Sequence, residues 1–278
     1  SSRSVGVYTN IILLKLNIIM KFNTLLYNAE DSVVTISLNR PESYNAFNGE
    51  MRSELLRAFE IVAEDRQCRV VVLAGEGKAF CSGQDLKDIE GETVDFNAFL
   101  KNGYNPIIKA MRSLAKPIIC KLNGVAAGAG CSLALACDFI VASERASLIE
   151  VFVGIGLVLD SGSSYFLPRL VGSNKAFELA TMGNKVTAAK AVEWGMINRA
   201  VSAENLDEEV SAVVSYYAQA PTLAVGMMKE MLNRSMNSTL DEVLDFEAHF
   251  QSIAGASLDY NEGVQAFVEK RKAVFNGS

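Results

Sequence analysis

Short apolar runs alternate with helical patterns over most of the chain, and this alternation limits the possible folds more than any other feature. Four β-branched or apolar runs end at turn-forming or polar residues, as strands do: Val33–Leu38, Val70–Leu73, Ile118–Leu122 and Phe139–Ala142. Helical patterns follow them, among them Met51–Glu64 and Pro106–Leu114. Alternating strands and helices predict an α/β fold. The uneven spacing of the units suits a loose strand-strand-helix spiral better than a solenoid of identical repeats.

The C-terminal part of the chain follows a different plan. After about Glu204 the pattern is wholly helical, with two long amphipathic segments at Leu223–Met236 and Leu240–Ile253. Helices of this kind either cap the core or build an oligomer.

The stretch Lys116–Asp138 predicts a strand, a turn at Asn123-Gly124, and a glycine-alanine segment that enters a small apolar helix. Gly128 and Gly130 have no side chains, so a ligand can approach the backbone, and the first amides of the helix have no partners inside it. Such N–H groups beside the positive end of a helix suit an oxygen that carries negative charge. The alternative is a glycine-rich packing turn into a buried helix.

Two further stretches carry candidate chemistry. Gly75–Ile89 predicts a strand and a glycine loop, from which Gly83-Gln84-Asp85 enters a new helix. Two N–H groups from separate loops could then converge on one carbonyl oxygen and stabilise an enolate or a tetrahedral oxyanion. In Gly154–Arg169, Asp160 stands directly before a Ser-Gly-Ser-Ser helix opening. It is either an ordinary N-cap or a functional carboxylate.

Composition excludes several classes of chemistry. The single histidine, His249, removes most histidine-based mechanisms and leaves carboxylates, hydroxyls and backbone amides. The five cysteines are an odd number without Cys-x-x-Cys spacing, which indicates buried thiols, a reducing compartment such as the cytoplasm, and no metal site. A net charge of -6 without a Lys/Arg cluster argues against nucleic-acid binding, which needs many phosphate contacts.

The sequence pattern of the first residues differs from that of the rest of the chain. Their apolar run, Ile11–Ile19, is broken by Lys15 and Asn17 and is too short to span a bilayer, and no small-residue cleavage site follows it. We therefore expect residues 1–19 to be a cloning remnant or upstream translation outside the fold, before a start at Met20, and we expect no membrane partner.

Taken together, four motifs resemble the enoyl-CoA hydratase/isomerase (crotonase) superfamily. They are NRPESYNAF from Asn39, KAFCSGQDL from Lys78, NGVAAGAGCSLALACDFIVAS from Asn123, and EGVQAFVEKRKAVF from Glu262. The resemblance covers Met20 to Gly277. It implies a crotonase spiral of ββα repeats over residues 20–203 and a helical trimerisation region over residues 204–278. It further implies trimers or paired trimers, and an acyl-CoA thioester as substrate, with coenzyme A part of the substrate and no permanently bound cofactor.

The resemblance also implies roles for particular residues. The oxyanion-hole amides would belong to Gln84 and Ala129. The positions that contact coenzyme A within one protomer would be Tyr44, Ser82, Gln84, Asp85 and Leu86. Phe267 and Lys270 match C-terminal positions that reach the coenzyme A of a neighbouring subunit.

Departures from the family pattern bear on the reaction. Where hydratases of the family carry two glutamates, this chain has Ser132 and, counted back without gaps from Gly156, Phe152. Neither is a general base at neutral pH. Glu150 lies two residues upstream of Phe152 and matters only if the register shifts locally. Asp160 matches the catalytic aspartate of several isomerases, and GLVLDSGSSYFLPRLVG is especially similar to ring-1,2-epoxyphenylacetyl-CoA isomerases.

These features predict an acyl-CoA isomerase in which Asp160 moves a proton while the amides of Gln84 and Ala129 hold the thioester oxyanion. The alternatives are a hydratase that uses Glu150 and, from another class, an RNA-binding relative. The sequence does not give the acyl group. Phe96, Phe99 and Tyr104 either line an aromatic-friendly pocket or belong to the core or an interface.

Overall fold

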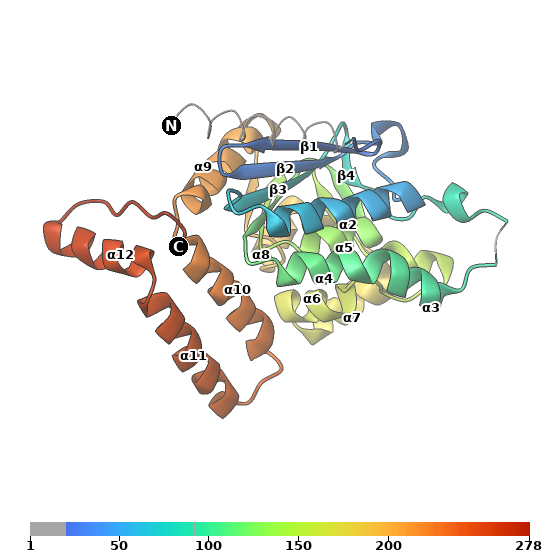
Figure 1. The fold of residues 1–278 in the computed structure, drawn as a ribbon. Coiled ribbons are helices and arrows are strands. Elements are labelled where there is room, and N and C mark those ends of the chain that lie inside the picture. Colours follow the sequence, from blue (N-terminus) through green and yellow to red (C-terminus); the bar gives the residue numbers. More distant parts are fainter. Residues whose placement is uncertain (1–20, 92) are drawn as a thin grey trace.

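The computed structural model describes residues 21–91 and 93–278, so the segment expected to be extraneous, residues 1–19, lies outside the described residues. Its centre is a six-stranded sheet with the order β1-β2-β3-β5-β7-β10 (Figure 1). The strands are Leu25–Glu30, Val33–Leu38, Val70–Gly75, Ile118–Leu122, Phe139–Ser143 and Arg199–Val201. Within this sheet, as far as the structure describes it, β1 and β2 pair antiparallel and the other neighbours pair parallel. The four strands predicted from the sequence are confirmed, and all four lie in this sheet.

A second sheet of four short strands stands beside the first, in the order β4-β6-β8-β9. Its strands are Ala79–Cys81, Val125–Ala127, Ser147–Ile149 and Val186–Thr187. Each of β4, β6 and β8 follows a long strand of the first sheet after a tight corner. At the corner before β6 a β-carbon on Gly124 would lie 2.1 Å from the carbonyl oxygen of Lys78, so only glycine fits there. The chain thus builds the predicted strand-strand-helix spiral.

Helices cover both faces of the large sheet. The predicted helices α2 (Gly49–Glu64) and α4 (Asn105–Ser113) bury Met51, Leu55, Phe59, Ile107 and Met111 in the main core. On the opposite face α9 (Leu206–Ala218) packs Leu206, Val210 and Val213 against Val70, Val72, Ile119 and Val141. Parallel strands buried on both faces explain the nearly continuous apolar runs seen in the sequence.

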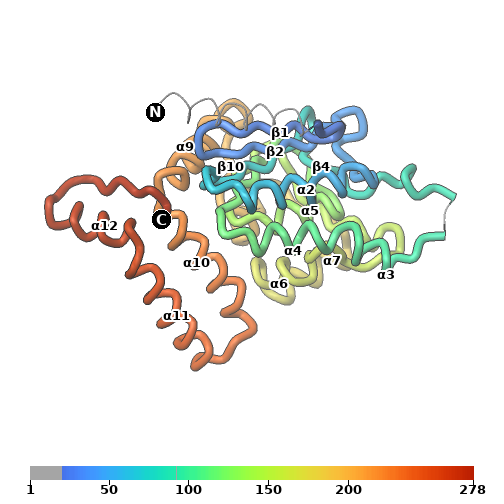
Figure 2. The backbone as a smooth tube through the Cα atoms, in the orientation of Figure 1, coloured from blue at the N-terminus to red at the C-terminus, as the bar shows by residue number. Residues whose placement is uncertain are grey.

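The remaining helices are α3 (Phe96–Phe99), α5 (Ala129–Leu135), α6 (Ser163–Val171), α7 (Ser173–Met182), α8 (Ala188–Glu193), α10 (Thr222–Ser235), α11 (Leu240–Gly255) and α12 (Leu258–Glu269). The two predicted amphipathic segments correspond to α10 and α11. Figures 1 and 2 show α11 and α12 projecting away from the sheets. None of the helices in the described part of the chain combines the length and apolar character needed to cross a membrane.

A buried ion pair anchors α10 to the core. The Lys229 ammonium lies 2.7 Å from one carboxylate oxygen of Asp138, and Arg112 donates to the other at 2.8 Å. Lys229 also donates to the main-chain oxygens of Met111 and Lys116. Asp138 is the carboxylate partner of the buried Lys229 ammonium, so removing Asp138 would leave that charge without its counter-ion in the interior, which is strongly destabilising.

Candidate active site

Two loops meet where the parallel strands β4 and β6 end. A β-carbon on Gly83 would lie 2.8 Å from the carbonyl oxygen of Ala127 and 3.6 Å from the amide nitrogen of Ala129. Gly83 also has φ of +96°, so glycine alone allows this approach. Within residues 21–91 and 93–278, the amides of Gln84 and Ala129 donate no hydrogen bond to the protein. The fold therefore sets the two predicted oxyanion donors on adjacent loops.

The first turn of α5 is held tightly against the end of β4. A β-carbon on Gly130 would lie 2.2 Å from the carbonyl oxygen of Cys81, so this contact also requires glycine. Gly128, the residue before the helix, has φ of +52° and donates its N–H to Ile149. The helix thus begins at Ala129, whose N–H points out of the start of the helix as the sequence predicts.

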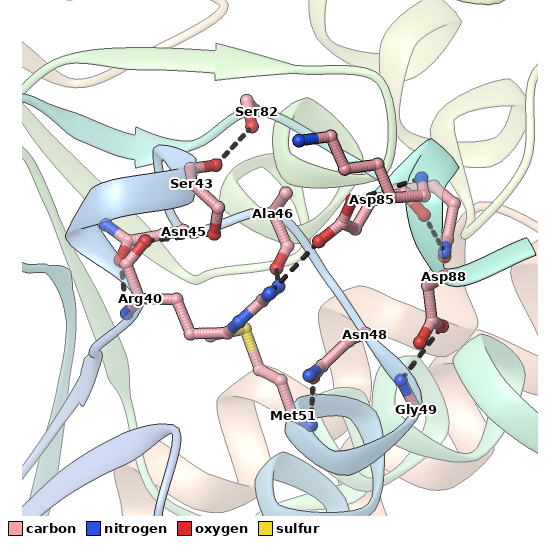
Figure 3. Close-up of polar contacts among 12 residues, drawn as sticks. Arg40, Ser43, Asn45, Ala46, Asn48, Gly49, Met51, Ser82, Asp85 and Asp88 are labelled. Atoms are coloured by element: carbon pink, nitrogen blue, oxygen red, sulfur yellow. Dashed lines mark hydrogen bonds and ion pairs between the residues drawn. The ribbon is translucent and has the colours of Figure 1, made fainter.

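A clamp of hydrogen bonds joins the loop of residues 40–47 to the loop that carries Gln84 (Figure 3). The Arg40 guanidinium donates to the Ala46 carbonyl at 2.5 Å and to the Asp85 carboxylate at 3.0 Å. Phe47 donates its N–H to Gly83 at 2.7 Å and accepts from the N–H of Asp85 at 2.9 Å. The oxyanion loop is therefore fixed on both sides of Gln84.

The side chain of buried Asn45 stabilises the same clamp. Its amide nitrogen donates to the carbonyl oxygens of Glu76 and Ala79, both at 2.9 Å, and its oxygen accepts from the N–H of Arg40. Tyr44 and Asn45 both have positive φ, which turns Tyr44 outward, where it is 55% exposed. Ser82 donates its N–H to the carbonyl oxygen of Tyr44 at 3.0 Å. Of the positions expected to contact coenzyme A, Tyr44, Ser82, Asp85 and the exposed Leu86 are thus gathered on one clamp.

The side chain of Gln84 is held as firmly as its backbone. Its oxygen accepts from Arg52 at 2.7 Å and from the hydroxyl of Tyr104 at 2.6 Å. Arg52 stacks on Phe99, and the two line a cavity of about 660 Å³ together with Asp88. Burial raises the pKa of Tyr104 well above its usual value, so the phenol is a neutral donor. Of the three aromatic residues in question, Phe99 lines a cavity, Tyr104 is buried in the core, and Phe96 is exposed.

Asp160 lies in a strained turn just before α6. The interpretation of Asp160 as the N-cap is wrong, because Gly162 occupies that position and α6 begins at Ser163. Ser161 and Gly162 both have positive φ, so the chain needs two consecutive left-handed residues here and reaches the helix later than the sequence suggests. Burial raises the pKa of Asp160, and the Ser161 hydroxyl offsets part of this rise. One carboxylate oxygen of Asp160 is buried and has no hydrogen-bond partner within residues 21–91 and 93–278.

The turn lies close to both oxyanion loops. Ser132, on the first turns of α5, donates to the carbonyl oxygen of Asp160 at 3.1 Å. The charge of Asp160 also acts on Tyr104, whose hydroxyl binds the Gln84 side chain. The Asp160 turn is therefore held directly against α5, the helix that begins at Ala129.

Glu150 is a second buried carboxyl in the same place, and the family pattern gave it only a conditional role. It follows β8, is 2% exposed, and has a carboxyl oxygen 2.9 Å from the hydroxyl oxygen of Ser163. Ser163 and Ser132 are joined by a contact of 2.7 Å between their hydroxyl oxygens. Burial raises the pKa of Glu150 to about 7; Ser163 and Cys131 lower it in part, and the charge of Asp160 raises it. The sequence carried one local sign of this buried carboxyl, which was a glutamate within an apolar run.

Phe152, found at one of the two hydratase positions by ungapped counting, is buried, and its ring lies 3.9 Å from where a β-carbon on Gly128 would stand. It packs behind the loop and offers no acid-base group. Phe267 and Lys270 belong to the end of α12, which Figure 1 shows on the far side of the molecule from α5. Phe267 is 85% exposed. One chain therefore does not bring these two residues to the site.

Comparisons with known proteins agree on the family. The family model for enoyl-CoA hydratase/isomerase matches residues 28–278. The chain is 40% identical over 257 residues to the 1,2-epoxyphenylacetyl-CoA isomerase of Escherichia coli, with 91% of this chain and 98% of the relative covered. It is 37% identical to a probable enoyl-CoA hydratase of Rhodobacter capsulatus, with 93% and 100% covered. The crystal structure of an enoyl-CoA hydratase of Mycobacterium smegmatis matches with a TM-score of 0.86 at 34% identity, with 91% and 98% covered.

Proposed function

Because the chain belongs to the enoyl-CoA hydratase/isomerase family, we propose that it is an acyl-CoA isomerase that uses Asp160 as its acid-base group. The observation that carries the proposal is the buried carboxylate oxygen of Asp160, which has no hydrogen-bond partner among the described residues and lies in a turn that contacts α5. A carboxylate of raised pKa, free to accept a proton, suits proton transfer at carbon. The name of the Escherichia coli relative supports isomerisation as the class of reaction.

The proposed reaction needs no group beyond those on this chain. The N–H groups of Gln84 and Ala129 hold the thioester oxygen and stabilise the negative charge that develops on it. Asp160 takes the proton from C2 of a 3-enoyl-CoA, and the C–H electron pair moves into a dienolate. The protonated Asp160 then returns the proton to C4, and the double bond moves from C3 to C2. One proton leaves and one returns, so the substrate is neither oxidised nor reduced.

The clamp around Arg40 fits the coenzyme A part of such a substrate. Tyr44, Ser82, Asp85 and Leu86 are fixed on one surface beside the Gln84 amide. We infer that the ligand lies along this surface and that its acyl group passes the two amides. The ring epoxide of a phenylacetyl thioester, named for the Escherichia coli relative, is a second substrate to assay beside 3-enoyl-CoA.

Asp160→Asn tests this function. Because Gly162 is the N-cap, a structural capping role of Asp160 cannot explain a loss of activity. The variant should keep its circular dichroism spectrum and its affinity for CoA thioesters, while kcat falls about 10²-fold to 10⁴-fold. The wild type should also exchange a C2 or C4 proton of the substrate with deuterated solvent, and the variant should not. Asp31→Asn, in the turn between β1 and β2, is the matched control. Full isomerase activity in Asp160→Asn would exclude the mechanism.

A hydratase is the second candidate, and Glu150 is the observation that favours it. In the described part of the chain its second carboxyl oxygen is also buried without a hydrogen-bond partner, and its pKa of about 7 suits a general acid-base group. The R. capsulatus relative carries the hydratase name. This reading predicts water addition to a trans-2-enoyl-CoA and a complete loss of that activity in Glu150→Gln at every pH.

We further propose that the C-terminal helices join protomers, most simply as a trimer. Large apolar side chains are exposed along α10, α11 and α12, among them Leu232, Leu240, Leu258, Phe267 and Val268, each at least 67% exposed. So many large exposed apolar side chains on three successive helices favour an interface. Such an assembly is the way Phe267 and Lys270 would reach the ligand of a neighbour.

A further inference from the structure

A chain of three side chains connects Glu150 to the backbone of Asp160. The contacts are Glu150 to Ser163 at 2.9 Å, Ser163 to Ser132 at 2.7 Å, and Ser132 to the carbonyl oxygen of Asp160 at 3.1 Å. Glu150 is 2% exposed and both serines are fully buried. Water therefore does not compete for these groups in the described structure, and the protons must be shared among the groups themselves.

Counting protons decides the direction of the chain. The three contacts of this chain need three protons, but the two serine hydroxyls carry one each, and the Asp160 carbonyl can only accept. The Ser132 hydroxyl also lies 3.3 Å from the carbonyl oxygen of Gly128, a longer contact than the 3.1 Å to Asp160, so this second acceptor competes for the same proton. If Glu150 is ionised, Ser163 donates to it and Ser132 donates to Ser163, so the contact with Asp160 has no proton. If Glu150 is protonated, it donates to Ser163, Ser163 donates to Ser132, and Ser132 donates to Asp160. Only the protonated form makes all three contacts hydrogen bonds.

The Glu150–Ser163–Ser132 chain ends at the Asp160 carbonyl, in a turn that its surroundings must hold in place. The Asp160 carbonyl opens the turn that contains Ser161 at φ +50° and Gly162 at φ +90°. A serine in the left-handed region costs about 1 kcal/mol or more and persists only where its surroundings hold it. The N–H of Ser163 gives the carbonyl one hydrogen bond at 3.0 Å, and Ser132 gives the second. Losing the second bond allows the turn to relax and the Asp160 carboxylate to move.

We propose that Glu150 is a positioning residue for Asp160: its carboxyl proton completes the Glu150–Ser163–Ser132 chain that holds the Asp160 carbonyl and so sets the carboxylate in place. The proposal rests on the proposed isomerase function. A neutral Glu150 also leaves Asp160 as the one charged carboxylate of the pair, because two ionised carboxylates side by side would repel.

The groups around Glu150 act on its pKa in both directions, and burial outweighs the donors. From α5 it faces Cys131 and from α6 it faces Ser163, which both lower its pKa, and from the turn it faces Asp160, which raises it. Burial and the nearby Glu150 raise the pKa of Cys131 well above its usual value, so this thiol is neutral too. Burial has the largest effect on Glu150 and raises its pKa to about 7. As the pH rises through this value, the Glu150 carboxyl loses its proton, and the contact between Ser132 and the Asp160 carbonyl is left without one.

Kinetics of four variants test the proposal. Ser163→Ala cuts the chain in the middle and should lower kcat about 10-fold to 100-fold, the scale of a small misplacement, with little change in KM. Ser164→Ala, an exposed neighbour on the same helix, is the control and should match the wild type. Glu150→Ala should resemble Ser163→Ala. Glu150→Gln carries an amide that donates to Ser163 at every pH, so it should restore most of the kcat that Glu150→Ala loses.

The pH profile separates positioning from a merely structural role. In the wild type kcat should fall as the pH rises above about 7, because Glu150 is then ionised. Glu150→Gln should lack this fall. Wild-type kcat in Ser163→Ala would overturn the proposal. So would a Glu150→Gln variant as inactive as Glu150→Ala, because Glu150 would then itself transfer the proton.

A structural measurement keeps the test independent of the proposed function. Crystal structures of the wild type and of Ser163→Ala at pH 6 should differ in the orientation of the Asp160 carbonyl and in the φ of Ser161. An unmoved turn would overturn the positioning role even if no isomerase substrate were found. A moved turn in a protein that isomerises no CoA thioester would uphold the chain and reject the isomerase.

Discussion

Replacing Glu150 by glutamine should change how the stability of the protein depends on pH, whether or not the protein turns over a substrate. The ordinary pKa of a glutamate is 4.5, and burial raises that of Glu150 to about 7. The folded protein therefore binds this proton more tightly than the unfolded chain does. Between these two values a rise in pH releases more protons from the unfolded state and favours unfolding, so the stabilising contribution is complete below pH 4.5 and lost above about 7.

The magnitude follows from the two pKa values. At about 1.36 kcal/mol per pKa unit, the rise from 4.5 to about 7 corresponds to ~3 kcal/mol in the free energy of unfolding. About 2.5 kcal/mol of this falls between pH 5 and pH 8. Glutamine has nearly the same shape, cannot ionise, and donates to Ser163 in place of the carboxyl proton. Relative to the wild type, Glu150→Gln should therefore gain about 2.5 kcal/mol of stability from pH 5 to pH 8.

Urea unfolding at fixed protomer concentration, followed by circular dichroism at several pH values, measures this difference. The control is Glu60→Gln, an exposed glutamate on α2, which should follow the wild-type curve within about 0.5 kcal/mol at every pH. Parallel pH curves for Glu150→Gln and the wild type would show that Glu150 has an ordinary pKa in the folded protein. That result would refute the reasoning from burial, and the direction assigned to the serine chain would fall with it.

Further predictions concern the oxyanion loop, the assembly and the N-terminal segment. Ala129→Pro should lower turnover about 10²-fold to 10³-fold, because the change removes one N–H donor of the oxyanion hole. It should not unfold the protein, because Ala129 is the first residue of α5, where proline fits. Normal turnover in a folded variant would exclude Ala129 from the oxyanion hole. Sedimentation at micromolar concentration should show a trimer, and a stable monomer would contradict the interface proposed for α10–α12. Lys270→Ala should raise KM more than it lowers kcat, since a contact distant from the reacting carbons binds ground and transition states alike; an equal loss in kcat would place Lys270 at the chemistry. Deleting residues 1–19 should leave folding and activity unchanged, and an insoluble product starting at Met20 would show that the segment is part of the fold.

The local sequence determined the main sheet and the long helices. The runs Val33–Leu38 and Ile118–Leu122 became strands with the predicted bounds, and α2, α4, α10 and α11 lie within two residues of the predicted helices. Apolar periodicity records which face of an element is buried, and that information is local. Strand β4 lies within Gly75–Ile89, where a strand was predicted, but the three-residue strands β6 and β8 were not predicted, because so short a segment has no readable period. Their existence depends on pairing with one another across the spiral.

The residues of the candidate site also divide into those that the sequence marked and those that it did not. Glycines before Gln84 and Ala129 marked the two oxyanion loops in the sequence, because only glycine permits the close approach found at Gly83 and Gly130. The sequence placed Asp160 beside a helix start but misjudged its part in that start, since two left-handed residues separate it from α6. Backbone conformation of this kind comes from the contacts that hold the turn.

Only the tertiary structure brought Glu150, Ser132, Ser163 and the Asp160 carbonyl together. In the sequence Glu150 is one glutamate in an apolar run, with nothing to indicate that its carboxyl is buried beside a second carboxylate. Periodicity says that a residue is buried but not which polar atoms it meets there. The polar contacts of a side chain determine its desolvation, the direction of its hydrogen bonds and its pKa. These contacts exist only once β8, α5 and α6 have packed against one another.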